Sequence, residues 1–81
     1  MDRAECRALH AALLERVQAA PVDMGVLMGL MQEYHALTAR LNESARLANS
    51  VHMHALNAEL LSVLTGKLSQ AFIAACNAMY G

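Results

Sequence analysis

The C-terminal stretch from Leu47 to Tyr80 constrains the fold most, because it combines a high apolar content with very few charges. Only Glu59 and Lys67 carry a full charge there at neutral pH. If the stretch is helical, successive side chains lie about 100° apart, and most of its large apolar residues share an arc of roughly 180°. The members of this arc are Leu56, Leu60, Leu61, Val63, Leu64, Leu68, Ala71, Phe72, Ala75 and Met79.

This apolar arc is wider than one neighbouring helix requires. A surface helix usually packs on a core through an apolar stripe of roughly 100°. The excess width predicts a second contact, either within the chain or with another chain. We expect the following arc residues to bind a partner: Leu56, Leu60, Leu61, Val63, Leu64, Leu68 and Phe72. On this interpretation Leu64→Asp or Leu68→Asp should abolish dimer or partner binding.

The composition predicts a single all-α domain spanning residues 1–81. Hydrophobic residues make up 57% of the chain and charged residues 16%, against typical values of about 45–50% and about 25%. Leu, Ala and Met, which favour helices, supply most of the apolar mass. A chain this short buries only roughly 60% of its unfolded surface. Self-association into a homodimer is therefore expected.

Charge and hydropathy exclude several classes of partner. The net charge of −1 provides no basic stripe for a phosphate backbone, so nucleic acid is not an expected partner. The longest apolar run, 71–76, is far shorter than the roughly 20 residues of a membrane-spanning helix. The N-terminus lacks the apolar segment of a signal peptide. A cytoplasmic protein without a membrane span is predicted.

The N-terminal part predicts a helix that begins after Asp2 and ends near Ala19. Asp2 and Glu5 have the spacing of an N-cap residue and its N3 partner. Pro21 lacks a backbone donor and disfavours helical geometry in the residue before it, so the turn should span 20–23. The apolar side of this helix would consist of Cys6, Leu9, Leu13 and Val17.

A second helix should begin at Asp23, which can act as its N-cap. Apolar and small residues then alternate at intervals of three and four, as in a heptad seam. The seam residues are Leu27, Leu30, Tyr34, Leu37, Leu41, Ser44, Ala48, Val51, Ala55 and Ala58. Asn49 and Ser50 can end one helix and cap the next, but a single long helix through this region is also compatible with the sequence.

The predicted architecture is thus an antiparallel bundle of two or three helices, a helical hairpin with a short N-terminal helix, that forms a dimer. Gly66 lies inside the last apolar helix, where glycine costs about 1 kcal/mol relative to alanine. A kink or a frayed turn is expected there.

No catalytic, cofactor-binding or metal-binding residues are predicted, and the chain is not expected to be an enzyme. The histidines are His10, His35, His52 and His54. None forms the i, i+4 pair of a helical zinc site, so we interpret them as surface or rim residues. The carboxylates are dispersed. Cys6 and Cys76 have no Gly-rich turn nearby and are interpreted as small buried hydrophobes that an up-down-up bundle would keep apart.

A second candidate surface lies at the start of the second helix. Gly25 and Gly29 form a small-x-x-x-small pair that permits close helix approach, although glycines near a helix start are often merely tolerated. Methionines suit surfaces that accept an imperfectly matched partner, although filling a core is their commoner use. We predict that Met24, Met28 and Met31 contribute to partner binding.

The segment LNESARLANSVHMHALNAELLSVL, residues 41–64, resembles the C-terminal half of FlgN-type export chaperones. The resemblance rests on Leu47, Asn49 and the leucines at 56, 60, 61 and 64. It implies a bacterial helical protein that holds an amphipathic segment of a secretion substrate. Small co-chaperones of type III secretion systems are similar in size and class. The resemblance and the apolar arc together predict a chaperone or co-chaperone.

A second resemblance implies an alternative function. Met53-His54-Ala55, Ser62-Val63-Leu64 and Gln18-Ala19-Ala20-Pro21 are similar to the quorum-sensing antiactivator TraM, which uses packed helices to disable a transcription factor. The alternative prediction is therefore a regulatory adaptor that sequesters a transcription factor.

Overall fold

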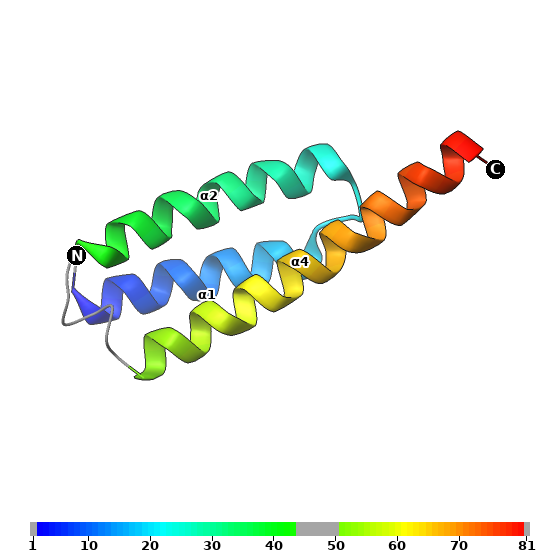
Figure 1. The fold of residues 1–81 in the computed structure, drawn as a ribbon. Helices are drawn as coiled ribbons and strands as arrows, with labels where there is room; N and C mark the ends of the chain where they lie inside the picture. The colour runs from blue at the N-terminus through cyan, green and yellow to red at the C-terminus, as the bar shows by residue number, and fades with distance from the viewer. Residues whose placement is uncertain (1, 44–50, 81) are drawn as a thin grey trace.

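The computed structural model describes residues 2–43 and 51–80, which form three helices and no strand. These are α1 (Arg3–Ala19), α2 (Met24–Asn42) and α4 (Val51–Tyr80). The helices run up, down and up along a bundle that measures 49 × 18 × 17 Å (Figure 1). The all-α class and the three-helix alternative are confirmed.

α2 and α4 are separate helices that pack against each other, so a single long helix is excluded. α2 ends at Asn42, with Glu43 as its C-cap residue. The predicted break at Asn49 and Ser50 lies outside the described residues.

The first two helices begin where the capping residues predict. The Glu5 backbone N–H donates to Asp2 Oδ1 at 2.7 Å, and the Val26 backbone N–H donates to Asp23 Oδ1 at 3.0 Å. Each aspartate thereby satisfies one of the free N–H groups at a helix start. α1 ends at Ala19, which confirms the turn expected from Pro21.

The core lies along the contact of all three helices. Its main cluster contains Leu13, Val17, Leu27, Leu30, Tyr34, Leu37, Leu60, Leu64 and Ala71. A smaller cluster at the end where α1 begins contains Cys6, Leu41 and Met53, with Leu56 packed against it. The predicted seam of α2 is therefore confirmed from Leu27 to Leu41.

Two parts of the predicted apolar pattern are wrong. Ala55 and Ala58 are exposed, because the seam of α2 does not carry over into the register of α4. In α1, Leu9 remains 36% exposed and His10 is buried in its place. Cys6, Leu13 and Val17 are buried as predicted, so the inward side of α1 differs from the prediction at this one position, where the helix packs against both α2 and α4.

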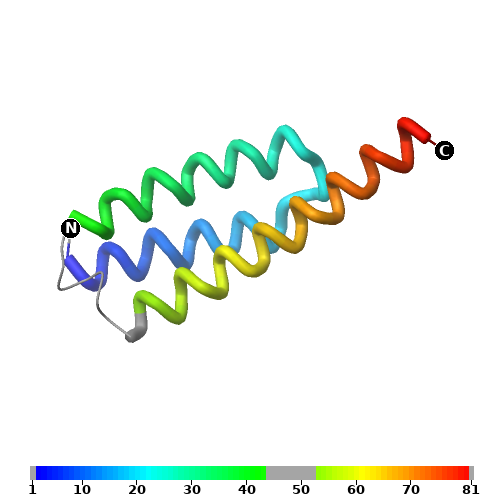
Figure 2. Tube along the Cα trace, viewed as in Figure 1, coloured from blue at the N-terminus to red at the C-terminus, as the bar shows by residue number. Residues whose placement is uncertain are grey.

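α4 is much longer than its neighbours. It has 30 residues, whereas α1 has 17 and α2 has 19, which corresponds to about 45 Å for α4. Figure 2 shows its orange and red end continuing past the turn between α1 and α2. Ala71 is the last residue of α4 whose side chain is buried. We call the segment that follows, Phe72–Tyr80, the overhang.

Gly66 lies within one continuous helix, and the expected fray does not occur. A Cβ added at this position would meet no atom within 4 Å. Gly66→Ala should therefore stabilise the chain by up to about 1 kcal/mol, because alanine loses less backbone entropy in a helix. Urea denaturation of both proteins would measure this difference. A loss of stability would show that another surface packs closely on Gly66.

Candidate protein-binding surface

The structure divides the predicted partner-binding residues into a buried and an exposed set. Leu60 and Leu64 have no exposed surface and lie in the core cluster. Their expected contact with a partner must be corrected, because they pack inside a single chain. The physical reason is that α4 lies against both α1 and α2, so much of its wide apolar arc is covered internally. Leu56 and Val63 are half-buried against the core clusters as well.

The remaining predicted residues lie wholly or partly at the surface. Leu61 is 38% exposed, Phe72 63%, Met24 37% and Met28 47%. Leu68 and Met31 are half-buried and pack on the edge of the core. Both predicted contact surfaces, the one on α4 and the one on α2, therefore include exposed side chains.

A shallow apolar groove joins these two predicted surfaces. It encloses about 500 Å³ and is lined by Met24, Leu68, Ser69, Phe72 and Ile73. We call it the α2–α4 groove. Met28 lies one helical turn from Met24 on the same side of α2, which extends the apolar lining along that helix. Residues far apart in the sequence, at the start of α2 and near the end of α4, therefore share one site.

The overhang continues this apolar site beyond the bundle. Ile73 is 58% exposed, Met79 76% and Tyr80 86%. Ile73 and Tyr80 were not predicted as contact residues, because their exposure depends on how far α4 extends past its neighbours. The overhang lies at the end of the bundle where α1 turns into α2, and α4 passes this turn because it continues without a break to Tyr80.

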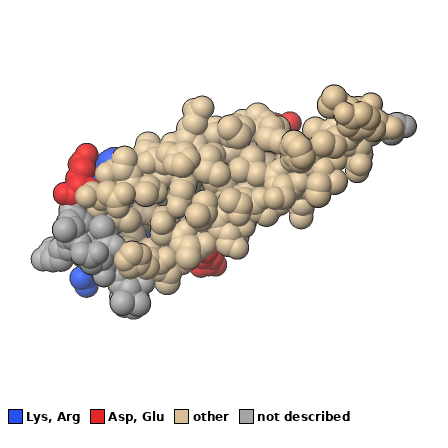
Figure 3. Space-filling model, in the orientation of Figure 1, with Lys and Arg blue, Asp and Glu red and all other residues tan. Residues whose placement is uncertain are grey.

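Charged side chains are sparse around the groove and absent from the overhang. No Asp, Glu, Lys or Arg follows Lys67 in the sequence. Figure 3 shows an almost entirely uncharged surface over α2, α4 and the overhang, with acidic and basic groups at its margins. Large apolar side chains exposed together on a surface without charges are typical of a site for another protein.

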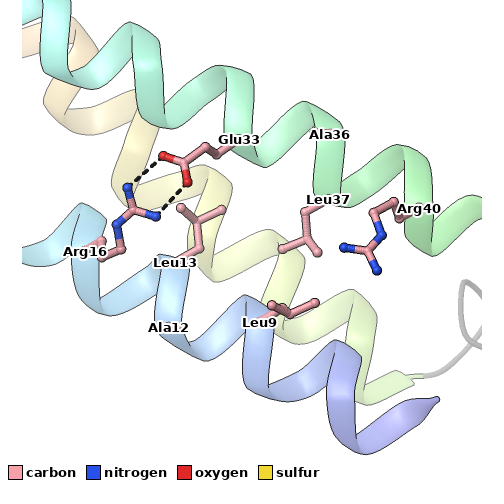
Figure 4. A pocket seen from close by; sticks show the side chains of 8 residues that line it. All are labelled: Leu9, Ala12, Leu13, Arg16, Glu33, Ala36, Leu37 and Arg40. Carbon is pink, nitrogen blue, oxygen red and sulfur yellow. Dashed lines mark hydrogen bonds and ion pairs between the residues drawn. The ribbon is translucent and has the colours of Figure 1, made fainter. Parts of the chain in front are cut away.

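A second cavity, of about 290 Å³, lies between α1 and α2 (Figure 4). Arg16 on α1 donates to both carboxylate oxygens of Glu33 on α2 at one end of this cavity, at 2.6 and 2.8 Å. The hydrogen bond from Arg16 holds the pKa of Glu33 below its usual value. Both side chains are about half exposed, so solvent screens the pair and its contribution to stability is small. We interpret this ion pair as a contact that aligns α1 and α2.

His10 is 1% exposed, so its interpretation as a surface or rim residue is wrong. Its Nδ1 lies 3.0 Å from the Cys6 backbone oxygen and 3.7 Å from Cys6 Sγ. Among the described residues, Nε2 has no hydrogen-bond partner. The spacing of four residues places the ring over the preceding helical turn, where its nitrogen can bond the Cys6 carbonyl.

The cysteines differ in environment. Cys6 is fully buried, and burial raises the pKa of its thiol. It is therefore a neutral core residue and not an activated nucleophile. Cys76 lies in the overhang and is partly exposed, which corrects its interpretation as buried. Both are free thiols near opposite ends of the bundle, as the up-down-up arrangement predicts.

Within 2–43 and 51–80, no three His, Cys, Asp or Glu side chains gather closely enough to bind a metal ion. Over the same ranges, no helix combines the length and hydropathy that crossing a membrane requires. Comparisons with protein-family models, with curated proteins and with solved structures find no match to this chain.

Proposed function

We propose that this chain is a non-enzymatic helical protein-binding module of the chaperone or co-chaperone type. It would act in the cytoplasm and hold an amphipathic helical segment of a secreted or assembling protein. The observation that carries the proposal is the exposed apolar surface of the overhang, which adjoins the α2–α4 groove.

The chemistry of the groove determines which segment it would accept. A helix that binds in an apolar groove presents anchors at intervals of three and four residues. Met24 and Met28 on the α2 side have flexible, polarisable side chains that adapt to differently shaped anchors. The surrounding surface has few charges, so affinity would come from apolar burial and depend little on salt.

Photo-crosslinking in cells would test this proposal. A photoreactive amino acid at Phe72, in the groove, should capture a partner protein, and mass spectrometry should map the attachment to an amphipathic helical segment. The matched control carries the same group at Ala74, which is exposed on the same helix but faces about 160° away from Phe72.

A partner that attaches through Phe72 but not Ala74 would support the proposal if it is a secreted or assembling protein. A transcription factor captured at the same position would instead support the sequestering adaptor. Equal capture at both positions, or attachment through a charged loop, would contradict a helix-binding groove.

A further inference from the structure

A stripe of residues on α4 continues from the bundle onto the overhang at intervals of four and three. We call it the heptad stripe, and its members are Leu61, Thr65, Leu68, Phe72, Ala75 and Met79. Leu68 is half-buried and the others are exposed, so α1 and α2 leave this stripe largely uncovered. Apolar residues at heptad spacing are the pattern with which one α-helix pairs with another along its length.

We propose that the heptad stripe binds α4 of a second copy of this chain in antiparallel orientation. The two-fold axis would pass near Phe72, and the overhang of each chain would lie in the α2–α4 groove of the other. Met79 of one chain would then lie beside Thr65 of its partner. This inference uses the same surface as the proposed function, so a second copy and a partner segment would compete for the α2–α4 groove.

A two-fold dimer requires a surface that complements itself, and the charge distribution meets this requirement. The stripe and the overhang carry no charged residue, so two copies meet no like-charge repulsion. Lys67, the charge nearest in sequence, donates to the Gln18 and Ala20 backbone oxygens at 2.7 Å and is directed toward α1. Glu59 faces about 160° away from Leu61.

The available surface favours the antiparallel arrangement over a parallel one. Taking about 200 Å² for a large side chain, the exposed parts of Phe72, Ile73, Met79 and Tyr80 amount to roughly 550 Å² per chain. A parallel pair would bury mainly this overhang. Antiparallel pairing would also cover Met24 and Met28 and reach roughly 700 Å², close to the roughly 800 Å² that each partner usually contributes to a stable interface.

The total surface is also larger than that of a compact monomer. The chain exposes 5144 Å², whereas a compact protein of its mass exposes about 4,800 Å². The excess is consistent with the overhang, most of which extends past α1 and α2.

Light scattering coupled to gel filtration would test the dimer. The wild-type chain should have the mass of a dimer at micromolar concentration. Phe72→Asp should weaken the dimer roughly 100-fold or more, because each copy loses an apolar anchor and two like charges meet at the axis. Ala74→Asp adds the same charge to the far side of the overhang and should remain dimeric. Circular dichroism should show equal helicity in both variants.

Disulfide trapping would test the orientation, with Cys76→Ser in all chains. A mixture of Thr65→Cys chains and Met79→Cys chains should form a disulfide-linked dimer, because antiparallel pairing brings these positions together. Met79→Cys chains alone should remain unlinked. Efficient linkage of Met79→Cys with itself would show a parallel pair and overturn the proposed arrangement.

A monomeric wild-type chain, or a dimer that Phe72→Asp leaves intact, would overturn this inference. Either result leaves the proposed function separately testable, because a monomer can still be crosslinked to a different protein through Phe72. Conversely, a dimer in which Phe72 crosslinks only to a second copy of this chain would support this inference and contradict the chaperone function.

Discussion

Leu64→Asp is expected to unfold the chain. Leu64 is completely buried in the cluster shared by the three helices. Removing most of its side chain, as in Leu64→Ala, should cost about 2–5 kcal/mol, and a domain of this length has a total stability of about 4–12 kcal/mol. A carboxylate in the same place adds the cost of burying a charge without a partner. Far-UV circular dichroism would show the loss of helix.

Leu61→Ala is the matched control, because it removes the same atoms from the same helix one turn away, where Leu61 is 38% exposed. Leu61→Ala should lower the free energy of unfolding by less than about 1.5 kcal/mol, because less of the removed side-chain surface is buried. Urea denaturation of Leu61→Ala and Leu64→Ala would compare the two sites. If Leu64→Asp stays folded and loses only partner binding, α4 must present Leu64 to a partner and not to α1 and α2.

Local signals in the sequence predicted the first half of the fold well. Asp2 and Asp23 cap their helices through contacts three residues away, and Pro21 acts on its immediate neighbour. The α2 seam from Leu27 to Leu41 likewise depends only on the spacing of residues within a single helix. These features depend on short stretches of chain, so the sequence determines them almost independently of tertiary packing.

The predicted contact surface was only partly right, because it depends on how helices meet. The angular positions of the side chains around the axis of α4 show that its apolar arc is wide. They do not show which part of the arc is covered by other helices of the same chain. Leu60 and Leu64 are covered by α1 and α2, whereas Phe72 lies beyond the core. That division follows from the relative lengths and positions of the helices, and neither is encoded within α4 itself.

His10 was misassigned for a related reason. Histidine is polar, so its position in the pattern predicted a surface residue, while Leu9 was expected in the core. In the structure the Nδ1 of His10 lies within hydrogen-bond distance of the Cys6 backbone oxygen, which lowers the cost of burying the ring. Such a contact within α1 becomes visible only once the orientation of the helix relative to its neighbours is known.

Lys67 makes a tertiary helix cap that spacing along the sequence does not reveal. Its ammonium group donates to the backbone oxygens of Gln18 and Ala20 at 2.7 Å each. These carbonyls lie at the end of α1, where the last C=O groups of a helix lack partners within it and the helix dipole favours a positive charge. The contact therefore attaches α4 to the turn that precedes α2.

Lys67→Met should destabilise the chain by about 1–2 kcal/mol. This value is near the lower end of the range for hydrogen bonds that involve a charged group, because solvent reaches part of the site and weakens the interaction. Methionine keeps most of the aliphatic stem, so the loss reports on the ammonium group. Gln70→Met, at an exposed position on the same helix, should change stability by less than about 0.5 kcal/mol. Urea denaturation at low and high salt would compare the two. If the ammonium group caps α1, added salt should reduce the difference in free energy of unfolding between Lys67→Met and the wild-type chain. Equal free energies of unfolding for the two proteins at low salt would instead show that water can replace the lysine.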